Sequence, residues 1–280
     1  MTELLNQSPY PTAPDQIEAW AAARRLPIAN AERRFAHFLA LRSIADAPWI
    51  KQRVVIQGST VAAYVFDAGR APRDIDLLVR NRHNDLIPED EKRELIDRTS
   101  TALSAGTRKF CPNFDQWRER LREYIHVEFF GPMTPFNEIP FRVDPATTTA
   151  TVMVLDATSL LATKYHALLR GRVLLGTGVR RSNYSQDVFD IGSLLTRNPG
   201  KFKMSLVIDH LLRDPRQFWT PAMSQAEVFN DDFRAAAERN YDQLREPTGD
   251  HFLEFPQAWR ATIDFFAAAR SSHPSNTKPA

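Results

Sequence analysis

The chain has 280 residues, of which 43% are hydrophobic, and a formal net charge of +2 at pH 7. This composition is typical of a globular protein with a sizeable core, arranged as one large domain or two smaller ones. No apolar run approaches the roughly 18 residues of a membrane span, and the N-terminus lacks the basic and then apolar layout of a secretory signal. We therefore expect a cytoplasmic protein without a membrane segment.

The single cysteine, Cys111, excludes an internal disulfide and a C-x-x-C zinc site, which agrees with a reducing compartment. Beside Phe110 and Pro112, it is expected to be a packing residue. The small net charge does not by itself indicate a nucleic-acid-binding protein. Basic residues nevertheless cluster at 118–122 and 164–181, so one face could be basic enough to hold a phosphate backbone.

Helices are predicted ahead of the first strand, because apolar residues recur at helical spacing in Ile17–Arg24 and Ala31–Ile44. A short apolar run then ends in Gly58-Ser59, and a second apolar run follows about one short helix later. This local pattern predicts a strand, a Gly-Ser turn, a helix and a second strand at residues 53–56, 58–59, 60–66 and 75–79.

Two carboxylates are expected on one face of the second strand, because Asp74 and Asp76 are two positions apart and Ile75 points into the core. Paired oxygen ligands are what Mg²⁺ or Mn²⁺ takes when it also holds nucleotide phosphates. Gly58 would permit a close backbone approach, and Ser59 would offer a hydroxyl and an N–H to phosphate at a helix start. A bare D-x-D is more often a solvated strand end, and Gly-Ser-Thr a helix cap, but their combination favours a metal and phosphate site.

Further along, Pro88–Ala105 predicts an exposed, charged helix and Ile125–Phe130 a third strand. On that strand Glu128 alternates outward with His126 while their neighbours face the core, so Glu128 is the best-placed third carboxylate for the metal. Asp144 is the alternative, and a purely solvent-facing role for Glu128 also stays open.

Strand-like runs stop after Thr151–Leu155 and helical periodicity takes over, so we place a boundary near residue 155. We expect an α+β chain, in which a small mixed sheet flanked by helices is followed by a helical bundle. The predicted bundle helices cover residues 159–169, 187–195, 203–212, 224–244 and 255–269. The predicted domains are residues 1–155 and 156–270, followed by a disordered polar tail at 271–280.

A second group of charged residues lies in the helical half. Residues 160–172 predict an amphipathic helix that carries Lys164 and ends at a glycine. The next predicted helix has Asp187 and Asp190 on one face. Lys164 can act as a point charge on phosphate, and nearby arginines can grip phosphate oxygens in a forked geometry. The alternative is a solvated basic helix followed by acidic first-turn residues that complement the helix dipole. His166 is as easily a core histidine as a substrate contact.

Three features together resemble the AbiEii/AbiGii toxin family of the nucleotidyltransferase superfamily. They are the Gly58-Ser59-Thr60 turn, Arg70 four residues before Asp74, and the Asp74-Ile75-Asp76-Leu77 run. The helical half matches the family pattern at Lys164, Arg172, Asp187 and Asp190. The chain departs from that pattern at three places: Gly58-Ser59 replaces a pair of glycines, Pro72 replaces a serine, and Gln186 replaces a lysine.

The resemblance implies a nucleotidyltransferase-fold domain and a helical domain that contributes lysine, arginine and aspartate side chains to the cleft. It implies that Asp74, Asp76, Lys164 and Asp187 are catalytic, with Mg²⁺ or Mn²⁺ on Asp74 and Asp76 and Glu128 as a possible further ligand. Asp187 would hold Lys164, the substrate hydroxyl or the base in place. The implied nucleotide-binding residues are Gly58, Ser59, Thr60, Arg70, Arg172, Arg180, Arg181 and Asp190.

The implied reaction is transfer of a nucleoside monophosphate from an NTP to an RNA acceptor, with the 3′ end of tRNA as the best guess. Such a toxin would block translation and growth, and its antitoxin would be encoded nearby. Two alternatives remain: an adenylyltransferase acting on a protein side chain or a small molecule, and a binding protein with this fold and no catalytic activity.

Overall fold

The computed structural model describes residues 8–80, 87–111, 125–130, 136–178, 184–213, 218–248 and 251–272. The chain divides into two compact units, and each is described by itself. Unit 1 comprises Met1–Val65, Ala71–Pro132 and Glu138–Leu155. Unit 2 comprises Phe66–Arg70, Met133–Asn137 and Asp156–Ala280. Two short segments from the first half of the chain therefore belong with the helical half, and the simple division at residue 155 stays a prediction.

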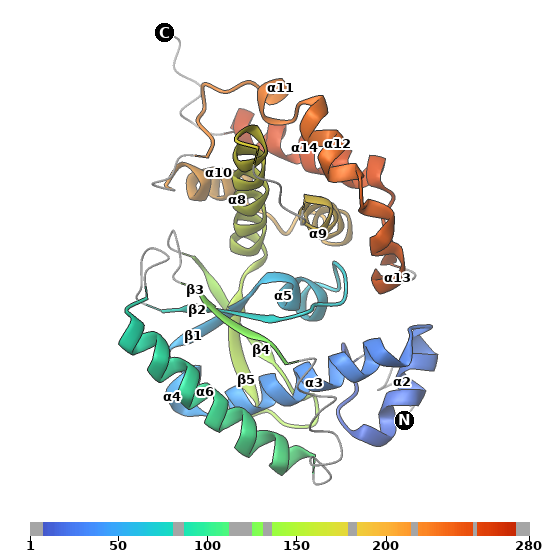
Figure 1. The fold of residues 1–280 in the computed structure, drawn as a ribbon, viewed down its shortest axis with the longest axis vertical. Coiled ribbons are helices and arrows are strands. Elements are labelled where there is room, and N and C mark those ends of the chain that lie inside the picture. The colour runs from blue at the N-terminus through green and yellow to red at the C-terminus, as the bar shows by residue number, and fades with distance from the viewer. Residues whose placement is uncertain are drawn as a thin grey trace. The chain divides into compact units, whose positions relative to one another are not determined.

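Unit 1 contains, in its described part, a five-stranded mixed sheet with the order β3-β2-β1-β5-β4 (Figure 1). β1 pairs antiparallel with β2 and parallel with β5, while β2 pairs parallel with β3, and β4 pairs antiparallel with β5. The mixed sheet expected from the sequence is confirmed. The strands are β1 Val54–Gln57, β2 Ile75–Val79, β3 Val127–Phe130, β4 Glu138–Arg142 and β5 Thr151–Leu155.

The helices of unit 1 pack on this sheet and on each other. α3 and α6 run side by side (Figure 1), and a Cβ added at Gly106 of α6 would lie 3.0 Å from the Cα of Ser43 in α3. Only a residue without a side chain allows this close approach of the two helices. Cys111, at the end of α6, is buried, as expected for a packing residue. The helices are η1 Pro14–Gln16, α2 Ile17–Arg24, α3 Ile28–Ala45, α4 Pro48–Lys51, α5 Gly58–Val65 and α6 Glu89–Phe110.

Unit 2 is helical in its described residues. Its principal packing is between α9 and α14, where a Cβ at Gly192 would lie 2.6 Å from the Cα of Ala258. None of the helices in the described part of the chain combines the length and the apolar character needed to cross a membrane. The elements are α8 Ala157–Gly176, α9 Tyr184–Arg197, α10 Met204–Leu212, α11 Gln225–Val228, α12 Asp231–Glu238, η2 Tyr241–Leu244, α13 Arg245–Thr248 and α14 Phe255–Ser272.

Three sequence-based boundaries in this unit are wrong. The single helix predicted at 224–244 is broken into α11, α12 and η2, because α11 ends at Val228 and the Asn230 side chain caps the start of α12. The glycine stop predicted within 160–172 does not act as one, since α8 continues through Gly171 to Gly176. The tail predicted from residue 271 does not include Ser271 and Ser272, which belong to α14, and its remaining residues lie outside the described part of the chain.

Candidate active site

The junction between β1 and α5 requires glycine for two reasons. Gly58 has a φ of +73°, a backbone conformation that side chains rarely adopt. A Cβ at this position would also overlap the carboxylate of Asp76, whose Cγ would lie 3.0 Å away. Asp76 is opposite Gln57 in the β1–β2 register, so its carboxylate packs directly against the backbone of the turn. In this structure the group that lies close to Gly58 is the Asp76 carboxylate, and an approach of nucleotide to Gly58 stays a prediction.

The next two residues of the turn are buried, and the Thr60 hydroxyl donates a 2.8 Å hydrogen bond to the carbonyl oxygen of Asp74. This bond ties the first turn of α5 to the residue that precedes β2. The hydroxyl of Thr60 is thus used to position Asp74, and a contact of Thr60 with nucleotide stays a prediction. Ser59 lies in the same first turn, and the N–H groups at a helix start are in general suited to an anion.

The far end of α5 is anchored in the core through Tyr64. Its hydroxyl lies 2.8 Å from Nδ1 of His37 on α3, and its ring packs edge-on against Tyr10. Burial raises the pKa of Tyr64 above its ordinary value, so this residue remains a neutral hydrogen-bonding partner. The helix that begins at the Gly58 turn is therefore held at both ends.

Four potential metal ligands lie on one face of β2 and β3. The parallel register pairs Ile75 with Val127 and Asp76 with Glu128, and the Ile75 N–H donates to the carbonyl oxygen of His126 at 2.8 Å. Residues paired in a parallel ladder project to the same face, and so do residues two positions apart on one strand. The array formed by Asp74, Asp76, His126 and Glu128 is called the strand-end array below.

Three members of the strand-end array fit a divalent cation, whereas Asp76 is outside this group. Asp74, His126 and Glu128 each offer one ligand atom, and these atoms lie within 4.8 Å of one another. Ligands around one octahedral ion at about 2.1 Å are separated by about 3 Å when adjacent and about 4 Å when opposite, so small rotations of exposed side chains would close the site. Glu128, the expected third carboxylate, is thus close to Asp74 and beside Asp76. His126 was not expected as a ligand, although His126-x-Glu128 repeats the spacing of Asp74-x-Asp76.

The alternative third carboxylate, Asp144, lies elsewhere in unit 1. It follows β4, which forms the opposite edge of the sheet from β3. One carboxylate oxygen accepts a 2.9 Å hydrogen bond from the Ala146 N–H, and the other lies 4.0 Å from Nε of Arg42. Asp144 therefore stabilises a turn and a buried arginine, and Glu128 is the better candidate.

In unit 2, a buried ion pair joins α8 and α9. Lys164 Nζ donates to Asp190 Oδ2 at 2.5 Å, and Arg70 Nε lies 3.8 Å from Asp190 Oδ1. Asp190 is fully buried and Lys164 is 9% exposed. Asp190 is therefore the counter-ion of two cations, and a contact of Asp190 with nucleotide stays a prediction. The lysine-holding role considered for Asp187 is filled here by Asp190, while Asp187 is buried one turn earlier on α9.

The segment Phe66–Arg70 is attached to α9 by further bonds. The N–H of Gly69 donates to Ser193 Oγ at 2.9 Å, and the side-chain amide of Asn198 donates to the carbonyl oxygen of Phe66 at 2.9 Å. These bonds explain why this short segment belongs with unit 2. They also fix the backbone that carries Arg70 next to Asp190.

The remaining predicted residues are less informative. Arg172 is half-buried on α8, while Arg180 and Arg181 lie outside the described residues, as does the basic cluster at 118–122. The His166 ring packs against Phe218 with 5.2 Å between ring centroids, which agrees with a packing role.

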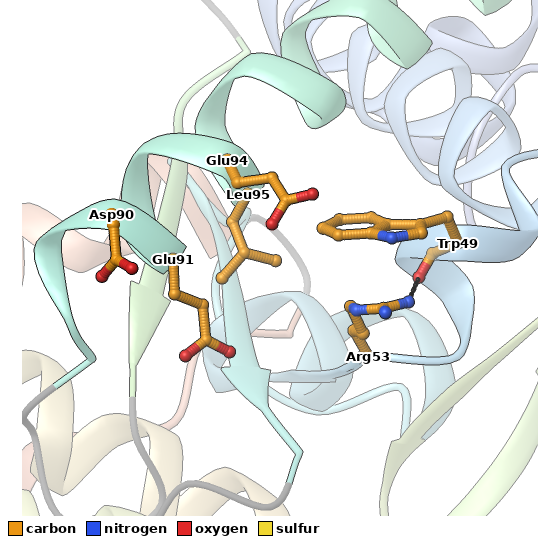
Figure 2. A pocket seen from close by; sticks show the side chains of 6 residues that line it. All are labelled: Trp49, Arg53, Asp90, Glu91, Glu94 and Leu95. Carbon is orange, nitrogen blue, oxygen red and sulfur yellow. Dashed lines mark hydrogen bonds between the residues drawn. The ribbon is translucent and has the colours of Figure 1, made fainter.

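Figure 2 shows a cavity of about 400 Å³ in unit 1 that contains none of the predicted site residues. The Arg53 guanidinium lies 4.1 Å from the centre of the Trp49 ring, and three carboxylates face the same space. Its lining residues are Trp49, Arg53, Asp90, Glu91, Glu94 and Leu95. Arg98 pairs with Glu94 at 2.9 Å, so the two carboxylates of Asp90 and Glu91 face Arg53 across the cavity, a lining that disfavours a triphosphate.

A mixed sheet with a Gly-Ser turn between a strand and a helix, and a D-x-D pair on the neighbouring strand, has the features of a nucleotidyltransferase. A family model described as nucleotidyl transferase AbiEii toxin, type IV TA system, matches residues 40–269. The chain belongs to this family, and is thus a nucleotidyltransferase toxin of a type IV toxin–antitoxin system with a nucleotide substrate and an antitoxin partner. No curated protein matches the chain, and no solved structure matches it either.

Proposed function

We propose that the protein transfers a nucleoside monophosphate from an NTP to a hydroxyl of an RNA acceptor, with the 3′ end of tRNA as the first candidate. The acceptor oxygen would form a bond to the α-phosphorus, the bond to the β-phosphate oxygen would break, and pyrophosphate would leave. Transfer to this end of tRNA would block its use in translation and stop growth. The observation that carries the proposal is the strand-end array beside the Gly58-Ser59 turn.

Asp74, Asp76 and Glu128 would hold Mg²⁺ or Mn²⁺ in this proposal. A bound divalent ion supplies charge neutralisation on the α-phosphate and on the leaving pyrophosphate. Ser59 would bind phosphate oxygens through its hydroxyl and N–H, and the absence of a side chain at Gly58 keeps the Asp76 carboxylate against the turn. Positioning and electrostatic stabilisation are most of what this chemistry requires from a protein.

In unit 2, Lys164 is proposed to bind phosphate through donors that remain after its bond to Asp190. Arg172 would add a forked contact, and Asp187 would orient the acceptor hydroxyl or its base. Arg180 and Arg181 keep the phosphate-binding role that the resemblance implies. An RNA acceptor is what the family resemblance implies, and the clusters of basic residues in the sequence are compatible with it.

The test is incubation of the purified protein with each α-labelled NTP, a divalent ion, and either total RNA or total protein. We expect label in RNA. Asp76→Ala should lower the rate of incorporation about 100-fold or more, because it removes a proposed ligand of the metal ion. Each tenfold loss in rate corresponds to about 1.4 kcal/mol of transition-state stabilisation. Asp90→Ala, which removes an exposed carboxylate of the acidic cavity, is the matched control and should leave incorporation unchanged. Label found only in protein or in a small molecule would contradict the choice of acceptor, and full activity of Asp76→Ala would contradict the site.

A further inference from the structure

We infer that His126 is a ligand of the divalent ion, and that this nitrogen donor makes the strand-end array bind Mn²⁺ more tightly than Mg²⁺. The inference rests on the proposed function, because it names a ligand and an ion for the same site. It concerns a residue outside the carboxylate set that was expected from the sequence.

The backbone register places His126 beside Asp74. Its carbonyl oxygen accepts the 2.8 Å hydrogen bond from Ile75, the residue between the two aspartates. His126 and Asp74 therefore occupy corresponding positions just ahead of two paired parallel strands, and their side chains project to one face.

The side-chain geometry also brings the imidazole toward the carboxylates. Nδ1 of His126 lies 3.6 Å from Oε1 of Glu128, which is longer than a good hydrogen bond and close to the separation of two ligands on one ion. A donor atom of Asp74 lies within 4.8 Å of both. The His126 side chain is 67% exposed and that of Glu128 is 45% exposed, so neither is locked by packing and both can adjust to an ion.

The type of donor decides which ion benefits. Mg²⁺ strongly prefers oxygen ligands and keeps several waters. Mn²⁺ is also held by carboxylates, but as a transition ion it accepts an imidazole nitrogen more readily than Mg²⁺ does. Replacing one water in an all-carboxylate site by an imidazole nitrogen therefore stabilises Mn²⁺ and does little for Mg²⁺. As a surface ion pair with Glu128 alone, His126 would contribute little and would not distinguish between ions.

The experiment is calorimetric titration of Mn²⁺ and of Mg²⁺ into the full chain, without nucleotide or RNA, for wild type, His126→Ala and His126→Asp. We expect His126→Ala to weaken Mn²⁺ binding on the order of tenfold and to change Mg²⁺ binding less than about twofold. His126→Asp restores a ligand but supplies oxygen, so it should strengthen Mg²⁺ binding and lower the preference for Mn²⁺. Circular dichroism checks that all three chains are folded, which the exposure of His126 favours.

The matched control is Asp90→Asn/Glu94→Gln, which removes two carboxylates from the acidic cavity, the competing place where a cation could bind. This variant should bind Mn²⁺ as the wild type does. Equal Mn²⁺ affinity in wild type and His126→Ala would overturn the inference, as would an equal loss for both ions or a loss confined to the control.

Failure of the inference and failure of the proposed function give different results. A wild type that shows His126-dependent Mn²⁺ binding and incorporates no labelled nucleotide would contradict the proposed function alone. A wild type that incorporates nucleotide, with Mn²⁺ affinity independent of His126, would contradict this inference alone.

Discussion

At the scale of single residues, the candidate site depends on a glycine that serves two purposes. Gly58 adopts a φ that other residues rarely take, and it leaves space for the Asp76 carboxylate. Gly200 in unit 2 separates the two requirements, since it has a φ of +77° but no atom within 4 Å of an added Cβ. Comparing substitutions at Gly58 and Gly200 therefore tests whether the contact between Gly58 and Asp76 matters for catalysis.

We predict that Gly58→Ala and Gly200→Ala each lower the free energy of unfolding by about 1–2 kcal/mol, because both force alanine into a left-handed conformation. Only Gly58→Ala should abolish nucleotide transfer, since its Cβ would displace the Asp76 carboxylate. Chemical denaturation and the labelled-NTP assay measure the two effects. Normal transfer by Gly58→Ala would show that the position of Asp76 against the turn is not required.

A second residue-scale prediction concerns the buried pair of Lys164 and Asp190. Asp190→Asn should lower the free energy of unfolding by about 3–5 kcal/mol, because it leaves Lys164 and Arg70 as neighbouring cations without their counter-ion. Lys164→Met should cost less, because Arg70 remains beside Asp190.

The double variant Lys164→Met/Asp190→Asn should lose less free energy of unfolding than the two single variants lose together, since it removes both charges of the pair. Denaturant titration of the four chains gives the coupling free energy. Additive losses would mean that Asp190 does not act through Lys164.

At the scale of elements, the strands and most helices could be predicted because their signals are local. The runs at β1, β2 and β5 are short and apolar, and α2 and α3 have helical periodicity. A capping residue explains the failure at 224–244, since periodicity continued across Asn230 while its side chain accepted a hydrogen bond from the Phe233 N–H and began α12. Asn230 followed by Asp231 and Asp232 is a helix-start signal that is visible in the sequence.

The packing of α9 against α14 gives the element-scale prediction. Gly192→Ala should destabilise unit 2 by about 1–3 kcal/mol, because its Cβ would meet the Cα and Cβ of Ala258 at 2.6 and 2.7 Å. This overpacking outweighs the gain in helix propensity of about 1 kcal/mol. Gly176→Ala in α8 is the control, since an added Cβ meets nothing within 4 Å there. Denaturation midpoints of the two variants and the wild type measure the effect. A Gly192→Ala variant as stable as Gly176→Ala, or more stable, would contradict the close packing.

At the scale of the whole molecule, the candidate carboxylates could be predicted, but the candidate histidine ligand and the buried ion pair could not. Asp74, Asp76 and Glu128 follow from alternation along single strands. His126 becomes a candidate only through the register between β2 and β3, which are separated by a long stretch of sequence. The choice of Asp190 over Asp187 as the partner of Lys164 depends on side-chain positions across two helices, which helical spacing alone does not fix.

The most direct test of the central claim is mass analysis of tRNA 3′ ends from bacteria that express the wild type or Asp76→Ala. We predict added nucleotides on tRNA and arrested growth with the wild type, and neither with the variant at the same protein level. Arrested growth with unmodified tRNA would contradict the proposed acceptor. Equal modification by Asp76→Ala would contradict the claim that the strand-end array carries out the reaction.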